Sequence, residues 1–158
     1  MIGFSGHQGL PPATTDLVAA ELRGKLKRLA GLELIGVTML GPGADQLFAR
    51  IVLELGGHLY VVVPAKRYRD GFQDPEARRD YDRLYAMANY FEELDYVEST
   101  EEAHMAGGRV VVERADRLLA VWDGKPARGY GGTADIVAYA GERGVPVEVI
   151  WPEGASRD

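Results

Sequence analysis

The sequence predicts an α/β protein with a single doubly wound, mostly parallel sheet and helices on both faces, a Rossmann-like fold. Segments typical of buried strands alternate with segments of helical spacing along the 158 residues. The connections between successive strands are too long for hairpins, which favours parallel crossovers. Residues 59–63 form a continuous apolar run, as expected for a parallel strand that is covered on both faces.

Six strands are predicted from short apolar runs bounded by glycine, proline or charged residues. They are expected at residues 2–5, 33–40, 59–63, 92–97, 116–122 and 145–151.

Five helices are predicted between these strands. The first is capped by Thr14, Thr15 or Asp16 and ended by Gly31, and the others are expected at 47–55, from Pro75, from Ser99 or Thr100 to Arg114, and at 133–143. We expect one domain at residues 1–151 and a loose C-terminal tail at residues 152–158.

The stretch Arg128-Gly129-Tyr130-Gly131-Gly132-Thr133-Ala134-Asp135 connects the fifth strand to the last helix. Backbone N–H groups in such a glycine-rich turn can meet an anion, and the helix dipole adds about half a positive charge. Thr133 is expected to be the N-cap, with its hydroxyl at the mouth of the site. The alternative is a tight strand-to-helix connection that binds no ligand.

A second glycine turn, Gly41-Pro42-Gly43-Ala44-Asp45, also follows a predicted strand and precedes a helix. Ligands of doubly wound sheets bind at the carboxyl ends of the strands, near the reversal of strand order. Two such turns in one short chain favour a phosphate or nucleotide site over two ligand-free connections.

Composition excludes several classes of protein. The chain has no cysteine, which excludes disulfides and thiolate chemistry, and its first residues do not form a signal peptide or a membrane span. A cytoplasmic protein is the simplest interpretation. The formal net charge of -6 opposes nucleic acid as a partner, although a local basic patch could still exist.

Three segments resemble the SLOG superfamily, also called the lysine-decarboxylase-like or LOG-like Rossmann-type fold. These segments are Gly3-Phe4-Ser5-Gly6, Gly41-Pro42-Gly43-Ala44-Asp45, and Gly131-Gly132-Thr133-Ala134-Asp135 after its buried strand. The superfamily includes phosphoribohydrolases that act on nucleoside monophosphates, the DNA-processing protein A group, and small nucleotide-sensing domains. The resemblance implies a pocket for nucleotides or their ribose-phosphate parts.

The chain departs from the hydrolase motif Pro-Gly-Gly-x-Gly-Thr-x-x-Glu at its catalytic position. Gly132 and Thr133 match the Gly-Thr pair, but the glutamate position is occupied by Ile136. Asp135 is one residue early, which rotates it by about 100° around a helix. Whether the protein is an enzyme therefore stays open.

The candidate ligand-binding residues come from both glycine turns and from the carboxyl ends of two strands. Hydrogen-bond donors are expected from Ser5, Gly6, Gly43, Gly132 and Thr133, with Gly41 and Gly131 beside them. Asp45 and Asp123 are expected to hold ribose, and His7 to contact phosphate, although a capping aspartate, an Asx turn and an exposed histidine are nearly as plausible.

We expect a binding or sensing module for a nucleotide or nucleotide-derived phosphate. The alternative is a nucleoside 5′-monophosphate N-glycoside hydrolase, or a related glycosyl transferase, that uses Asp45, Asp123 or Asp135. No metal site and no required cofactor are predicted, although two aspartates could share Mg²⁺ with a phosphate. The expected partner is a nucleotide-type small molecule rather than a membrane or nucleic acid. A homodimer is expected through an aromatic and apolar surface that contains Tyr81, Leu84, Tyr85, Met87 and Tyr90.

Overall fold

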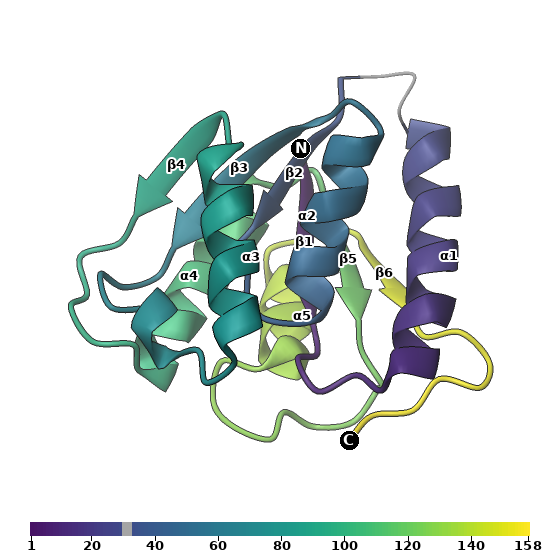
Figure 1. Ribbon diagram of the computed structural model, residues 1–158. Helices are drawn as coiled ribbons and strands as arrows, with labels where there is room; N and C mark the ends of the chain where they lie inside the picture. The colour runs from purple at the N-terminus through teal and green to yellow at the C-terminus, as the bar shows by residue number, and fades with distance from the viewer. Residues whose placement is uncertain (30–32) are drawn as a thin grey trace.

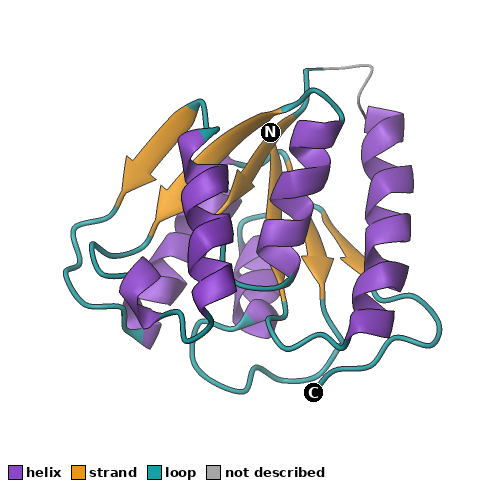
Figure 2. Ribbon diagram, in the orientation of Figure 1, coloured by secondary structure: helices purple, strands orange, loops and turns teal. Residues whose placement is uncertain are grey.

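The computed structural model describes residues 1–29 and 33–158. Its sheet has the strand order β4-β3-β2-β1-β5-β6, and every neighbouring pair is parallel. The strands are β1 (Ile2–Gly6), β2 (Ile35–Thr38), β3 (His58–Val63), β4 (Tyr90–Glu93), β5 (Arg117–Val121) and β6 (Val147–Ile150). All the strand arrows in Figure 2 point towards the same edge of the sheet. The predicted doubly wound α/β fold is confirmed.

Helices cover both faces of the sheet. They are α1 (Pro12–Leu29), α2 (Ala44–Glu54), α3 (Pro75–Ala86), α4 (Glu101–Arg114) and α5 (Thr133–Glu142), with a short 3₁₀ turn, η1 (Arg69–Gly71), before α3. In Figure 1, α1, α2 and α3 lie in front of the sheet, and α4 and α5 lie behind it. None of the helices in the described ranges is long and apolar enough to cross a membrane.

The sheet separates two hydrophobic clusters. The larger one lies under α1, α2 and α3, and its centre is the stacked pair of Phe4 from β1 and Phe48 from α2, with ring centroids 4.4 Å apart. The smaller one lies under α4 and α5 and includes Val37, Val62 and Ile136. The apolar residues of the inner strands are therefore shared between two helical layers, as the continuous apolar runs predict.

Several element boundaries differ from the predicted ones. The first helix begins at Pro12, ahead of the proposed caps, because a proline fits the first turn of a helix without losing a hydrogen bond. Its predicted end, Gly31, lies outside the described residues. The strand predicted at 92–97 is β4, which runs from Tyr90 to Glu93 instead. Its first residue, Tyr90, pairs with Tyr60 of β3. Because β4 is an edge strand, it lacks the apolar run that reveals a central strand.

The C-terminal tail, which we had expected to be loose, is hydrogen-bonded to the start of the chain. The Ser156 N–H donates to Thr14 Oγ1 at 2.9 Å, and the Asp158 N–H donates to the Gly9 carbonyl at 3.0 Å. Figure 1 shows the end of the chain beside the start of α1 and the connection that leads to α5. Residues 152–158 therefore return to the carboxyl edge of the sheet.

The surface predicted for a homodimer is only partly exposed. Tyr81 and Leu84 are buried in the larger cluster, whereas Tyr85, Met87 and Tyr90 are exposed. Dimerisation through these exposed side chains stays a prediction.

The contact between α4 and α5 depends on a glycine. A Cβ atom added to Gly108 would overlap Cδ1 of Ile136, which is 1% exposed. Ile136 therefore fills the space that a side chain at Gly108 would need. The position of the missing glutamate thus lies in the apolar layer between α4, α5 and the sheet.

This packing predicts opposite effects of two glycine-to-alanine substitutions. Gly108→Ala should lower the free energy of unfolding by about 1–3 kcal/mol because it overfills the core. Gly24→Ala, in α1, should raise it by about 0.5–1 kcal/mol because the added Cβ meets no atom beyond its own stretch of helix within 4 Å and alanine favours helix. Urea titrations measure both. A stabilising Gly108→Ala would contradict the described packing, and adding Ile136→Val to Gly108→Ala should recover part of the loss.

Candidate functional site

A cavity of about 220 Å³ lies at the carboxyl ends of β1 and β5, where the strand order reverses. This is the place where doubly wound sheets bind ligands. Its lining comes from the segments after β1, β2, β3 and β5, from α2, α4 and α5, and from the C-terminal segment. The lining residues are Ser5, Gly6, His7, Gln8, Met39, Asp45, Tyr68, His104, Ala127, Arg128, Gly131, Gly132, Thr133 and Arg157.

The first turn of α5 forms one wall of this cavity. The N-cap is Gly132, so Thr133 is the first helical residue rather than the predicted cap. The Thr133 hydroxyl accepts a hydrogen bond from Ser5 Oγ at 3.3 Å. Gly131 has φ of 87°, a conformation that favours glycine, and its N–H donates to Asp135 Oδ2 at 2.9 Å. The helix dipole places a partial positive charge at this wall.

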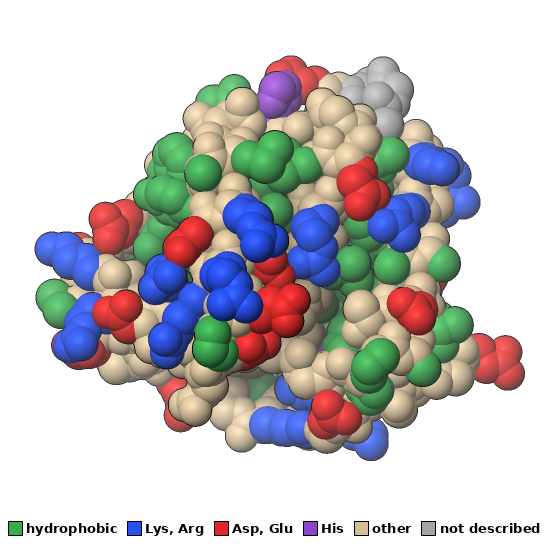
Figure 3. All heavy atoms as spheres, viewed as in Figure 1, with side chains coloured by type: hydrophobic (Ala, Val, Ile, Leu, Met, Phe, Trp, Pro, Cys, Tyr) green, Lys and Arg blue, Asp and Glu red, His purple; other side chains and the backbone are tan. Residues whose placement is uncertain are grey.

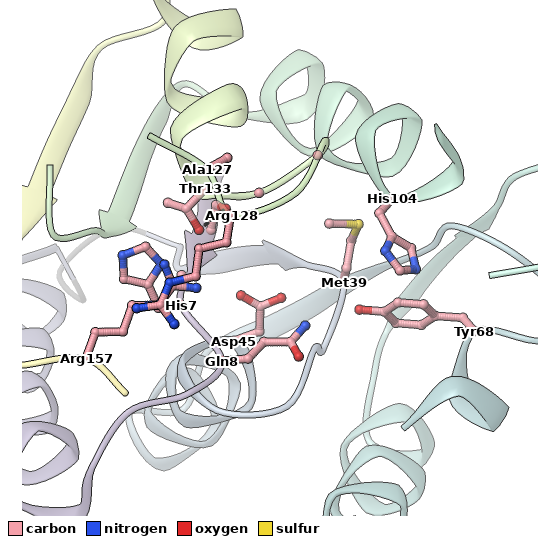
Figure 4. A pocket seen from close by; sticks show the side chains of 14 residues that line it. His7, Gln8, Met39, Asp45, Tyr68, His104, Ala127, Arg128, Thr133 and Arg157 are labelled. Atoms are coloured by element: carbon pink, nitrogen blue, oxygen red, sulfur yellow. Dashed lines mark hydrogen bonds between the residues drawn. The ribbon is translucent and has the colours of Figure 1, made fainter. Parts of the chain in front are cut away.

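Two arginines add full positive charges beside the α5 turn. Figure 4 shows Arg128 and Arg157 on the same side of the cavity as His7, with Tyr68 and His104 on the opposite side. Burial and the charge of Arg128 lower the pKa of Arg157, while Asp123 raises it. One side of the cavity is therefore suited to an anion.

The turn after β2 forms the floor of the cavity and has an unusual backbone. Leu40 has φ of 58° although it is not glycine, and its N–H donates to Thr38 Oγ1 at 3.1 Å. The Gln46 side chain donates to the carbonyls of Leu40 and Ala77 at 3.2 and 3.0 Å. These bonds hold the turn in place, and the Asp45 carboxyl, at the start of α2, lies in the cavity.

The environment of Asp45 changes its acidity. Burial raises the pKa of Asp45 to about 7, and the hydrogen bond from the Gly41 N–H, at 3.1 Å, opposes this rise only in part. Near neutral pH, the carboxyl can therefore either accept or donate a hydrogen bond. That property suits contact with hydroxyl groups of a ligand and also suits proton transfer.

The far side of the cavity carries Met39, Tyr68 and His104. The rings of Tyr68 and His104 meet edge to face with centroids 5.4 Å apart, and His104 Nε2 lies 2.7 Å from Ser99 Oγ. Burial lowers the pKa of His104, although Glu101 opposes the change, and burial together with Asp45 raises the pKa of Tyr68. This side therefore offers apolar surface and neutral hydrogen-bonding groups.

The structure brings seven of the predicted site residues into the lining. They are Ser5, Gly6, His7, Asp45, Gly131, Gly132 and Thr133. Gly41 and Gly43 lie behind the surface of the cavity. A Cβ at Gly43 would lie 2.5 Å from the Gln8 carbonyl, and one at Gly41 would lie 3.1 Å from Asp45 Oδ2. The absence of a side chain at Gly43 thus lets the Gln8 backbone approach the turn, and its absence at Gly41 lets the Asp45 carboxyl approach.

Asp123 and Asp135 lie outside the lining as well. Asp123 Oδ1 lies 3.2 Å from His7 Nε2 and accepts the Lys125 N–H at 3.0 Å. Burial and the charge of Arg157 lower the pKa of His7, so the neutral ring can accept the Asp123 N–H at 3.0 Å. Asp123 therefore orients His7, and Asp135 holds the α5 turn.

The short basic run at residues 66–69 is used for surface contacts. Arg67 pairs with Glu98 at 3.2 Å and with Asp70 at 3.6 Å, and Arg69 pairs with Asp82 at 2.6 Å. Figure 3 shows Lys, Arg, Asp and Glu side chains intermixed over α2 and α3. Neither arginine of the run is a lining residue of the cavity.

Sequence reasoning missed several lining residues, above all Gln8, Met39 and Arg157. No local motif marks them, because they reach the cavity from segments far apart in the chain. Within the described residues, no group of three His, Asp or Glu side chains is placed to hold a metal ion. Asp45 is the lining carboxyl that could contact Mg²⁺ carried by a phosphate.

The comparisons with known proteins show similarity at the level of the fold. No protein-family model and no curated protein matches the chain. DNA processing protein A from Streptococcus pneumoniae superposes with a TM-score of 0.70 at 17% identity, over 97% of this chain and 50% of that one. This chain therefore spans about half the length of that protein.

Two further solved structures have the same arrangement. DNA processing protein A from Helicobacter pylori, a single-stranded DNA-binding protein, has a TM-score of 0.68 at 14% identity, over 99% of this chain and 67% of its own. TM1055 has a TM-score of 0.59 at 17% identity, over 92% and 71%. The chain thus shares its Rossmann-like fold with these proteins, as the sequence resemblance implied.

One expectation from the net charge is wrong. We expected nucleic acid to be an unlikely partner, but the fold is shared with a protein that binds single-stranded DNA. A total charge of -6 averages over the whole surface and does not report local charge, and Arg128 and Arg157 both line the cavity.

The buried carboxyl predicts a pH-dependent effect of Asp45→Asn. Because the pKa of Asp45 is raised, the folded state binds the extra proton, and its stability falls as pH rises from about 4 to about 7. Asparagine does not ionise, so the variant should gain roughly 2–3 kcal/mol of unfolding free energy over the parent between pH 5 and pH 8. Urea titrations at the two pH values measure the difference. An equal difference at both would show that Asp45 is ionised throughout.

Proposed function

We propose that the cavity binds a nucleotide or nucleotide-derived phosphate. The observation that carries this proposal is the convergence of Arg128, Arg157 and the first turn of α5 on one side of the cavity. Guanidinium groups bind phosphate through paired hydrogen bonds, and a helix N-terminus offers unpaired N–H groups. The Thr133 hydroxyl, which accepts from Ser5 Oγ, lies at the same side and can donate to a phosphate oxygen.

The remaining lining suits the rest of a nucleotide. Asp45 and Gln8 present carboxyl and amide groups in the middle of the cavity, as expected for contacts with ribose hydroxyls. Met39, Tyr68 and His104 supply the apolar and aromatic surface beyond them. A neighbouring cavity shares Gln8, Tyr68 and His104 and extends past Phe72, which provides room for a base.

A short stretch of single-stranded nucleic acid is the second candidate ligand. The similarity to the Helicobacter pylori single-stranded DNA-binding protein, over 99% of this chain, favours it. Such a strand presents the same phosphate, sugar and base groups as a nucleotide. The two candidates differ in length and in whether the phosphate is terminal.

Hydrolysis of a nucleoside 5′-monophosphate is the enzymatic alternative. Asp45 favours it, because a carboxyl with a pKa of about 7 in a cavity suits general acid-base chemistry. Ile136 counts against the mechanism of the related hydrolases, since it packs against Gly108 in the core.

Removing one hydroxyl from the phosphate side should weaken binding. Thr133→Val keeps the side-chain shape but loses a hydrogen bond worth about 0.5–3 kcal/mol, depending on the charge of its partner. The affinity for the best nucleoside monophosphate should therefore fall by about three-fold to a hundred-fold. Calorimetric titration of the parent and the variant with a panel of nucleoside monophosphates measures the change.

Thr15→Val serves as the matched control, because Thr15 lies in α1 and donates to the Pro11 carbonyl, away from this cavity. Short single-stranded oligonucleotides belong in the same panel. Tight oligonucleotide binding with no measurable monophosphate binding would favour the second candidate. Equal affinities of the parent and Thr133→Val for every ligand would place the binding site elsewhere.

Turnover separates the binding module from the hydrolase. We expect the protein to bind nucleoside monophosphates without releasing free base, because Ile136 replaces the glutamate of the hydrolases. Incubation with the panel followed by chromatography tests this expectation. Base release that Asp45→Asn abolishes in a folded variant would overturn the binding-module proposal.

A further inference from the structure

The segment 152–158 is attached to the rim of the cavity by three contacts. Two are the backbone bonds of Ser156 to Thr14 and of Asp158 to Gly9, at 2.9 and 3.0 Å. The third is a hydrogen bond from the Arg128 guanidinium to the main-chain oxygen of Asp158. Arg157 lies between the two anchored residues, and its side chain enters the lining.

The Arg157 side chain is held in the cavity with an unused donor. Its Nε is buried and has no hydrogen-bond partner among the described residues. Within residues 1–29 and 33–158, no Asp or Glu oxygen lies within 4.0 Å of this guanidinium. A buried donor of a charged group is costly to leave unpaired. An anion bound in the cavity would give this donor an acceptor.

The guanidinium of Arg128 lies close enough for its charge to act on Arg157. The neutral ring of His7 is engaged with Asp123, whose N–H donates to His7 Nε2. Asp123 also acts on Arg157, but its oxygen already accepts the Lys125 N–H. Two guanidinium groups and the N-terminal end of α5 thus lie on one side of the cavity. Asp123 lies behind His7 on this side, and the Asp45 carboxyl lies at the floor of the cavity.

We propose that the segment 152–158 is part of the binding site and that Arg157, together with Arg128, binds a doubly charged terminal phosphate, as in a phosphomonoester. This inference rests on the proposed function and narrows its ligand class. A phosphomonoester carries about -1.5 to -2 at pH 7, and each oxygen can accept from a guanidinium fork. A phosphodiester, as found inside a nucleic-acid strand, carries one charge and has fewer free oxygens.

Two small probes test the charge preference without assuming a base. Methyl phosphate is a dianion at pH 8 and dimethyl phosphate is a monoanion of similar shape. NMR titration of the Gly131 and Gly132 amides and of the Arg157 Nε–H should show at least about tenfold tighter binding of methyl phosphate. Equal affinity for the two probes would overturn the preference for a terminal phosphate.

Variants of the segment test the role of Arg157. Arg157→Ala should weaken methyl phosphate by about 10- to 100-fold and change dimethyl phosphate much less, because a hydrogen bond between charged groups is lost. Arg157→Lys keeps the charge without the fork and should give an intermediate loss. Arg143→Ala, at the opposite end of α5, is the matched control and should leave both affinities unchanged.

Thr14→Val tests whether the attachment of the segment positions Arg157. It removes the acceptor of the Ser156 N–H but lies outside the cavity lining, so methyl phosphate should weaken several-fold while dimethyl phosphate does not. Melting curves show whether each variant is folded.

The outcomes separate the inference from the proposed function. If the parent binds methyl phosphate and both folded Arg157 variants bind it as tightly, the role of Arg157 is overturned and the phosphate site stands. If neither probe perturbs the parent at millimolar concentration, the phosphate site and the role of Arg157 are both overturned.

Discussion

The close packing of the first turn of α2 against the end of β1 determines the geometry of the cavity. Gly6 allows it, because a Cβ there would lie 2.6 Å from the Cβ of Ala44, which is fully buried. The Ala44 N–H donates to the His7 carbonyl at 3.3 Å, and Gly43 lets the Gln8 backbone approach. This contact carries Asp45 to the floor of the cavity and fixes the direction of the chain after β1, from which His7 and Gln8 project.

The fold could be predicted because its determinants are local. Apolar runs mark the central strands, glycine and proline mark most turns, and the alternation of the two element types requires parallel crossovers. The predicted ends of an element were wrong where that end is set by contact with a segment distant in the sequence. The edge strand β4 begins at Tyr90 because Tyr90 pairs with Tyr60 of β3. The sequence of residues 92–97 does not reveal this pairing, so the predicted strand began two residues too late. The tail was expected to be loose because its anchors, Gly9 and Thr14, lie at the other end of the sequence.

The site was predictable in position but not in its full set of residues. Both glycine turns reach the carboxyl edge of the sheet, as the topology requires, and most of their predicted residues line one cavity. Of the three candidate aspartates, only one lines the cavity, and sequence spacing does not show which one. Asp135 accepts the Gly131 N–H and Asp123 faces His7, whereas Asp45 is buried with its carboxyl directed into the cavity. Arg157 carries no motif, and only the folded chain brings it beside Arg128.

The two ends of the chain differ in what they can tolerate. Met1 lies at the amino edge of the sheet, where its carbonyl accepts the Asp116 N–H at 2.8 Å, whereas Asp158 lies at the rim of the cavity. An affinity tag or fusion partner joined before Met1 would leave the protein on the side away from the cavity. The same addition after Asp158 would start within reach of Arg128 and could occupy or cover the entrance. Purification and assay designs for this protein therefore favour additions at the N-terminal end.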